Sequence, residues 1–300
     1  MSEDCPEDPA PMRPQSLMLT FLGQHVLGRD LAVFSGSFIE VFARLGVSEH
    51  ATRSTLSRMA ARGLLCRSRR GRRVYFGLTP RSEAILTDGE VRVHETGAVN
   101  LDAGGCWTLV GFSLPESWGR QRRELRSQLI WAGFGMLHSG LWIAPSHVDI
   151  SDILEELNLR DHVKVFSAQP SGPTDIVQLV HDAFDLEGLA ERYRAFLRRW
   201  DRPCPLPRAP DDLARQLHMK AEWLQLIRHD PRLPTRHLAP DWPAMRAQQV
   251  FHELDAAYEE PSRCLLSGIL DTITTGARSL SGAVGDGRRR AASRPEDTPG

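Results

Sequence analysis

The chain has 300 residues, of which 41% are hydrophobic and 25% charged, and its formal net charge is −1. This length and composition predict several folded domains and exclude a chain that is disordered throughout. Apolar runs stay well short of the roughly 18 residues that a membrane helix needs, which excludes a membrane-spanning protein. The acidic, Pro-rich N-terminus has no signal-peptide core and the five cysteines form no close pair, so we expect a protein of the reducing cytoplasm.

Changes of pattern along the sequence divide the chain into segments and predict a multidomain α+β protein. We expect a disordered leader over 1–14 and a disordered tail, rich in Gly, Ser and Arg, over 271–300. Between them we expect an N-terminal domain over 15–100, a middle domain over 105–180 and a mainly helical C-terminal domain over 181–270.

The N-terminal domain begins with successive helical patterns. Apolar residues recur at helical spacing over 17–25 and again over 38–45. Ser48 is a suitable N-cap for a further helix, which Gly63 ends. Two short helices joined by a tight turn predict a helix-turn-helix, whose second helix enters the major groove of DNA.

The helix that follows Ser48 has an apolar inward face and a polar outward face. We expect Leu56 and Met59 to point inward. The residues of this helix predicted to contact DNA are His50, Thr52, Arg53, Ser54, Ser57 and Arg58. Among the outward residues we expect His50, Arg53 and Ser54 to reach base edges, with Ser57 and Arg58 nearer the DNA backbone.

The next segment predicts a β-hairpin with a strongly basic tip. Two β-prone runs flank Arg70-Gly71, and Thr79 and Pro80 then start another helix. The arginines around the tip are Arg67, Arg69, Arg70, Arg72 and Arg73, and the hairpin residues predicted to contact DNA are Arg69, Arg70, Arg72, Arg73 and Tyr75. This order of helices and hairpin is that of a winged helix.

The local charge supports an anionic partner for this domain. From Arg44 to Arg81 there are ten arginines and a single acid, Glu49. A charged face is often merely solvated, and for any one arginine that alternative stands. Clustered arginines repel one another, however, and contact with DNA phosphates offsets that cost.

The middle domain shows the order β-α-β-β-α-β of the ferredoxin-like fold. WTLVGFS at 107–113 predicts a strand, and the helix after it should turn Leu125, Leu129 and Ile130 inward. Two strands that turn at Ser139-Gly140, a second helix and a closing strand complete the pattern.

The C-terminal domain and the motifs of the whole sequence give no sign of an enzyme. Trp200, Trp223 and Trp242 lie on or beside helical apolar stripes, where we expect core packing, or else an apolar ligand pocket between domains. No P-loop or GxSxG motif occurs, and a zinc site starting at His252 lacks its second histidine. We therefore expect no catalytic residue, no metal site and no cofactor.

Separate blocks of the sequence resemble one known family. They are GVSEHATRSTLSRMAARGLL (46–65), GRRVYFGLT (71–79), WTLVGFSLPE (107–116), AGFGMLHSGLWIAP (132–145) and RLPTRHLAPDWP (232–243). In this order, and over roughly residues 15–265, the chain is similar to the PaaX-type repressors, which regulate phenylacetic acid degradation. The resemblance implies a homodimeric repressor of an aromatic-catabolic operon that an aryl-CoA thioester, typically phenylacetyl-CoA, releases from its DNA operator.

The sequence is also compatible with other functions. The middle domain of the family is similar in fold to small CRISPR-associated nucleases, so a metal-dependent endoribonuclease is the main alternative. Those nucleases place an acid at the end of the first strand, whereas this sequence has Phe112-Ser113-Leu114 there. A non-regulatory nucleoid or RNA-binding protein is a third interpretation. No residue is assigned to the effector, although arginines of the middle and C-terminal domains offer cations for CoA phosphates.

Overall fold

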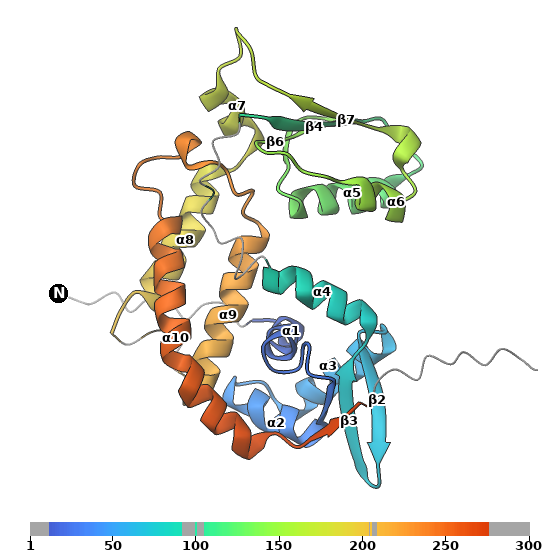
Figure 1. Cartoon of the computed structure of the whole chain (residues 1–300), viewed down its shortest axis with the longest axis vertical. Helices are drawn as coiled ribbons and strands as arrows, with labels where there is room; N and C mark the ends of the chain where they lie inside the picture. The colour runs from blue at the N-terminus through green and yellow to red at the C-terminus, as the bar shows by residue number, and fades with distance from the viewer. Residues whose placement is uncertain (1–11, 92–99, 101–104, 204, 206–208, 276–300) are drawn as a thin grey trace, which may run out of the picture.

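The computed structural model describes residues 12–91, 100, 105–203, 205 and 209–275, and these form an α+β structure. Figure 1 shows an N-terminal part and a middle part at opposite ends of the molecule. The long C-terminal helices run along one side and connect the two parts. No helix in the described part of the chain is long and apolar enough to cross a membrane.

The N-terminal part contains α1, β1, α2, α3, a β2–β3 hairpin and α4. Their bounds are α1 Pro14–His25, β1 Leu31–Phe34, α2 Ser35–Arg44, α3 Glu49–Ala61, β2 Leu65–Arg70, β3 Arg73–Leu78 and α4 Pro80–Val91. The predicted N-cap of α3 is confirmed, because the Ser48 hydroxyl accepts a hydrogen bond from the Ala51 amide at 3.3 Å. Gly63 follows α3 with φ +70°, a conformation that favours glycine.

One sheet combines the hairpin with two strands that the sequence did not predict. Its order is β2-β3-β1-β8, where β8 is Thr272–Thr274, and all its pairings are antiparallel. The tail assigned to 271–300 therefore contains a strand, and Pro14, assigned to the leader, opens α1. Both β1 and β8 are too short to show an alternating pattern, and only pairing across the chain stabilises them.

The middle part has the predicted order of elements. Its bounds are β4 Trp107–Phe112, α5 Gly119–Trp131, β5 Gly135–His138, β6 Leu141–Ala144, α6 Ser151–Glu156, η2 Arg160–His162 and β7 Val163–Ala168. The antiparallel sheet has the order β5-β6-β4-β7, and α5 and α6 cover one face. Leu125 and Leu129 are fully buried as expected. Ile130 is not buried, since it is 47% exposed.

The C-terminal part is helical, as predicted. It comprises α7 Ile176–Ala183, α8 Leu186–Trp200, α9 Asp212–Arg228, η3 Thr235–His237 and α10 Ala244–Ile269. Trp200 and Trp223 are buried in its core, where Trp223 stacks on Phe251 with ring centroids 4.7 Å apart. Trp242 packs at the edge of the same core. The core interpretation of these tryptophans is confirmed.

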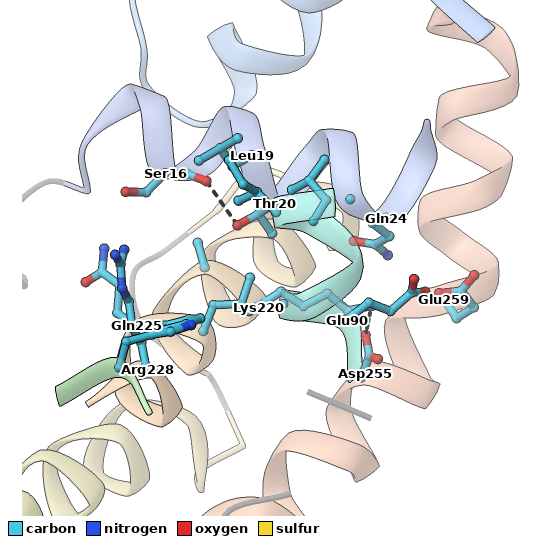
Figure 2. Close-up of a pocket in the computed structure, with 17 residues that line it drawn as sticks. Ser16, Leu19, Thr20, Gln24, Glu90, Lys220, Gln225, Arg228, Asp255 and Glu259 are labelled. Carbon is cyan, nitrogen blue, oxygen red and sulfur yellow. Dashed lines mark hydrogen bonds and ion pairs between the residues drawn. The ribbon is translucent and has the colours of Figure 1, made fainter. Parts of the chain in front are cut away.

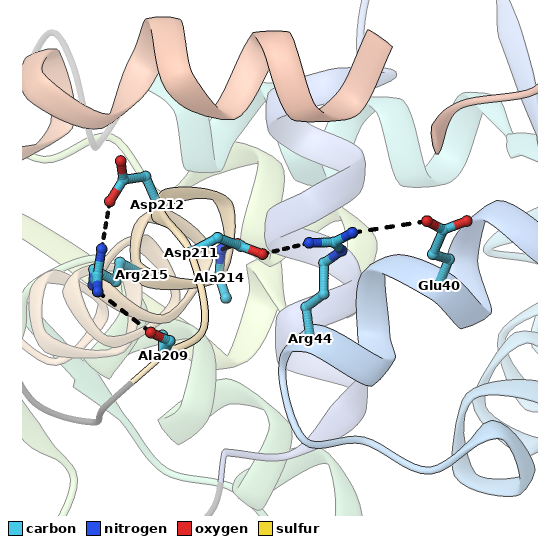
Figure 3. Close-up of polar contacts among 7 residues, drawn as sticks. All are labelled: Glu40, Arg44, Ala209, Asp211, Asp212, Ala214 and Arg215. Carbon is cyan, nitrogen blue, oxygen red and sulfur yellow. Dashed lines mark hydrogen bonds and ion pairs between the residues drawn. The ribbon is translucent and has the colours of Figure 1, made fainter. Parts of the chain in front are cut away.

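The N-terminal and C-terminal parts share a hydrophobic core. Leu213 and Leu217 of α9 and Leu266 of α10 pack into the cluster that contains Phe21 and Phe42. Figure 3 shows polar contacts beside this core, where the Arg44 guanidinium of α2 binds the Asp211 carboxylate at 2.5 Å. Asp211 also caps α9 by accepting a hydrogen bond from the Ala214 amide. The helices α9 and α10 therefore support the fold of α1–α3 directly.

Candidate nucleic-acid interface

The outward face of α3 presents a row of polar side chains to solvent. His50, Arg53, Ser57 and Arg58 are exposed, and Ser54 is half-buried. The opposite face of α3 is fixed to the core through Leu56 and Met59 (both 1% exposed). A buried apolar face therefore holds the helix in one orientation and directs these polar groups outward.

Arg53 is one of the exposed cations on this face. Its Nε donates to the Glu49 carboxylate at 2.8 Å, and both side chains are 58% exposed. An exposed pair with this i,i+4 spacing is worth only about 0.3–0.5 kcal/mol, so Arg53 can exchange Glu49 for a base or a phosphate at little cost.

Burial removes Thr52 from the predicted contact set. Its side chain is 0% exposed, and its hydroxyl donates to the Ser48 carbonyl oxygen at 3.1 Å within the helix. The helical spacing of the sequence places position 52 at the boundary between the two faces. The packing of α3 on its neighbours, which the sequence does not show, determines that Thr52 lies on the buried side.

The hairpin tip carries the other group of exposed cations. Arg67, Arg69, Arg70 and Arg72 are all exposed, and Gly71 makes the turn with φ +59°. Figure 1 shows the hairpin beside α3, and Leu56 of α3 and Leu65 of β2 belong to the same core. The arginines of β2–β3 and the polar face of α3 are therefore carried by one rigid unit.

Arg73 and Tyr75 have structural partners that the sequence did not indicate. Both contact the Asp271 carboxylate, and the Arg73 guanidinium lies over the Phe34 ring, 5.2 Å from its centroid. Tyr75 is only 5% exposed. These contacts remove Tyr75 from the contact set and assign Arg73 partly to the hairpin's own stability. The sequence feature that could have indicated these contacts is Asp271, an acidic residue just before a β-prone Thr-Ile-Thr run.

Metal-dependent nuclease chemistry in the middle part would require a carboxylate at the end of β4. Phe112 ends β4, so no carboxylate occupies the end of that strand. Among the residues that the structure describes, no group of three or more His, Cys, Asp or Glu side chains is arranged to hold a metal ion.

Family models match most of the chain in consecutive blocks. A model described as PaaX-like protein matches residues 13–82, and one described as the PaaX protein central Cas2-like domain matches 100–180. A third, described as the PaaX-like protein C-terminal domain, matches 184–268.

Individual relatives agree with these blocks. The transcriptional repressor PaaX of Escherichia coli strain K12 is 27% identical over 253 residues, which cover 80% of this chain and 78% of that protein. An uncharacterized protein from Mycobacterium tuberculosis superimposes with a TM-score of 0.58 at 21% identity. That match covers 85% of this chain and 99% of the other, and it indicates a shared fold.

Proposed function

This chain belongs to the PaaX-like protein family, and on that premise we propose that it is a transcriptional regulator that binds duplex DNA. The observation that carries the proposal is the combination of the outward face of α3 with the exposed arginines of the β2–β3 hairpin. In our proposal α2 and α3 act as a helix-turn-helix, and the hairpin is the wing of a winged helix.

Base reading and phosphate contact have separate residues in this proposal. His50, Arg53 and Ser54 contact base edges in the major groove, with Ser57 and Arg58 nearer the backbone. The hairpin arginines, among them Arg69, Arg70, Arg72 and the partly engaged Arg73, bind phosphates beside it. Thr52 and Tyr75 act indirectly, because they hold α3 and β3 in place.

Regulation is the second part of the proposal. We propose a homodimeric repressor of an aromatic-catabolic operon, whose two α3 helices reach half-sites about 34 Å apart. An aryl-CoA thioester such as phenylacetyl-CoA favours a dimer arrangement that no longer matches this spacing. Release by a factor of ten to a hundred requires a coupling free energy of roughly 1.4–2.8 kcal/mol, within the usual allosteric range.

The test measures DNA affinity by fluorescence anisotropy. The full chain is titrated onto a duplex from the region upstream of its gene and onto a random duplex of equal length. We expect tighter binding to the upstream duplex, and a loss of that affinity when phenylacetyl-CoA is added but not with plain CoA. Equal affinity for both duplexes would contradict sequence-specific regulation and favour a non-regulatory nucleic-acid binder. An unchanged complex with phenylacetyl-CoA would reject that effector.

The alternative activity is tested in parallel. The match of the middle part to a Cas2-like domain model is the observation that favours an endoribonuclease. Labelled RNA is incubated with the full chain and Mg²⁺ or Mn²⁺. Because β4 ends at Phe112 without a carboxylate, we expect intact RNA. Metal-dependent cleavage that co-purifies with the chain would overturn this expectation.

A further inference from the structure

One cation of the β2–β3 hairpin already has a carboxylate partner within the chain. Arg73 pairs with Asp271, the residue just before β8, and the Arg73 side chain is 62% exposed. Arg69, Arg70 and Arg72 are exposed as well, but in the part of the chain that the structure describes no carboxylate forms an ion pair with them. To an approaching polyanion, the Arg73–Asp271 pair is therefore neutral, whereas the neighbouring arginines are positive.

The backbone of Asp271 is fixed by its neighbours in the fold. Its amide donates to the Ser37 hydroxyl of α2 at 3.0 Å, and its carbonyl oxygen accepts a hydrogen bond from the Phe34 amide of β1 at 2.8 Å. The Tyr75 hydroxyl of β3 donates to the two carboxylate oxygens at 3.3 and 3.4 Å. Because these contacts come from three different elements, the fold itself positions the carboxylate beside Arg73.

Arg73 is placed at the hairpin tip but is not locked there. Its guanidinium lies over the Phe34 ring, 5.2 Å from the centroid, and Arg73 stands opposite Arg70 in the hairpin register. Like charges directly opposite each other destabilise a strand pair, so the Asp271 carboxylate relieves a local repulsion. An exposed ion pair is nevertheless worth only about 0–1 kcal/mol, so a phosphate can compete with Asp271 for the same cation.

An ion pair inside the fold shows the contrast. Lys220 binds Asp255 at 3.0 Å beside a cavity lined by α1, α4, α9 and α10 (Figure 2), and the two side chains are only 12% and 16% exposed. Separation of such a pair leaves a buried charge uncompensated, which costs folding stability. Asp271 is 33% exposed, so its carboxylate stays hydrated when Arg73 turns to another anion.

The pairing changes what Arg73 contributes to DNA affinity. A cation that neutralises a phosphate releases counterions, and log affinity then falls with log salt by about 0.9 per contact. When Arg73 leaves Asp271 for a phosphate, the vacated carboxylate attracts a cation from solution. This uptake offsets the release at the phosphate, so the net contribution of Arg73 is close to zero.

We propose that Asp271 is an internal substitute for a DNA phosphate, which neutralises Arg73 and limits the affinity of the protein for every duplex. The proposal rests on the DNA-binding function above and deepens it, because it identifies a residue that weakens the hairpin contact. The exchange involves phosphates and leaves the base edges read by α3 untouched. Asp271 therefore sets how tightly the protein holds DNA and leaves its preference between sequences unchanged.

Two variants and a matched control isolate this role. Asp271→Asn removes the charge and keeps an oxygen that accepts a hydrogen bond from Tyr75. The double variant Asp271→Asn/Arg73→Ala removes the cation that the first change releases. Asp212→Asn is the control, since Asp212 is also 33% exposed and pairs with Arg215 at 2.6 Å at the start of α9 (Figure 3). Each variant changes the full chain, and thermal melts verify that it is folded.

Affinity for the upstream duplex and for the random duplex is measured by fluorescence anisotropy at a series of salt concentrations. Asp271→Asn should steepen the salt slope by about 0.9 per protomer and raise the affinity for both duplexes by the same factor, about three- to tenfold near 0.1 M salt. The double variant should return to the wild-type slope, and Asp212→Asn should leave it unchanged. An unchanged or shallower slope in Asp271→Asn, or a gain confined to one duplex, overturns the proposal.

A second polyanion separates this inference from the proposed function. Each variant is eluted from immobilised heparin by a salt gradient. Asp271→Asn should elute at higher salt than the wild type, and the double variant should elute with the wild type. Elution of Asp271→Asn together with the wild type would contradict the neutralisation of Arg73, even if the protein binds its duplex. If the expected heparin order is found but no variant binds either duplex, the DNA-binding function fails and the competition for Arg73 stands.

Discussion

His25 is a neutral histidine buried on the core-facing side of α1. It is 8% exposed, its ring packs against Phe21 with centroids 5.2 Å apart, and its Nε2 atom is buried without a hydrogen-bond partner. Burial, and to a smaller extent the positive charges of Lys220 and Arg29, lower the pKa of His25 from 6.5 to about 3. The fold of the N-terminal part therefore depends on the uncharged imidazole.

This burial predicts a pH-dependent loss of stability. Below pH 6.5 the unfolded chain binds a proton that the folded His25 does not, so stability falls as the pH drops toward 3. At pH 5 the loss amounts to about 2 kcal/mol. His25→Leu should flatten the dependence of the free energy of unfolding on pH over this range, as measured by urea denaturation. The exposed His181, changed to Leu, is the control, and an equally flat curve for that variant would contradict the assignment.

Arg53 allows a direct test of base reading. Arg53→Ala should cost about 1–3 kcal/mol on the specific duplex and relax the preference at one base position, because one side-chain contact to a base edge is lost. Affinity and base preference are measured on a set of single-substitution duplexes. Arg160→Ala is a matched control, since Arg160 is 62% exposed and binds Glu155 at 2.9 Å far from α3. An equal loss on specific and random DNA would make Arg53 a phosphate contact.

At the scale of single residues, the sequence predicted what helical spacing and local capping determine. The N-cap at Ser48 and the buried Leu56 and Met59 follow from positions within one helix. The burial of Thr52 and Tyr75 could not be predicted in this way. Thr52 is buried by the packing of α3 on its neighbours, and Tyr75 contacts Asp271, which lies almost 200 residues away in sequence.

In the proposed complex with DNA, the β2–β3 hairpin contributes to affinity through electrostatic contacts. Each phosphate contact releases counterions, so log affinity falls with log salt by about 0.9 per contact. Replacing Arg70 and Arg72 by Ala should reduce the slope by roughly two per protomer. The slope is measured from affinities at a series of salt concentrations. The double variant Arg120→Ala/Arg123→Ala removes two exposed arginines of α5 instead, and it should leave the slope unchanged. If both pairs alter the slope equally, the hairpin has no special role.

The strand β8 stabilises the sheet behind the hairpin from its other edge. It pairs with β1, with Ala32 opposite Ile273, and the Thr275 amide donates to the Asp30 carbonyl oxygen at 2.9 Å. Without β8, the backbone groups along that edge of β1 lose their partners.

Two truncations isolate the contribution of β8. Deleting residues 272–300 should lower the melting temperature by about 2–4 °C for each kcal/mol of pairing lost, relative to deletion of 276–300 alone. Both shortened chains keep Asp271, so the difference between their thermal melts reports the strand itself. Equal melting temperatures would show that β1 does not need this edge.

Elements differ in how far the sequence can predict them. The helices α3 and α5 and the hairpin show their own periodicity or turn signal, and they lie where they were expected. β1 and β8 have four and three residues, too few to establish an alternation. They exist because each finds a partner strand brought near by the rest of the fold.

On the scale of the whole molecule, the fold depends on which apolar faces pack against each other. The pattern of α9 predicts an apolar face but not its partner, and the structure pairs Leu213 and Leu217 with α1–α3. The middle part has a separate core around Leu125 and Leu129. A division at residue 181 describes the sequence pattern, whereas the core that supports the proposed DNA-binding surface includes residues on both sides of that boundary.

This arrangement predicts that a destabilising substitution in α9 also lowers the stability of α3. An equally destabilising substitution in the middle part should leave the stability of α3 unchanged. Leu217 and Leu125 are both 0% exposed, so Leu→Ala at each removes a comparable amount of buried surface, at a cost of about 2–5 kcal/mol. Hydrogen exchange read at the α3 amides distinguishes the two variants. In Leu217→Ala the protection of α3 should fall by the full cost of the cavity, because Leu217 and Leu56 belong to one cooperative core. In Leu125→Ala the loss should be confined to α5 and its sheet. Equal loss of α3 protection in both variants would mean that the chain unfolds as a single unit, and unchanged protection in Leu217→Ala would mean that α1–α3 fold without α9.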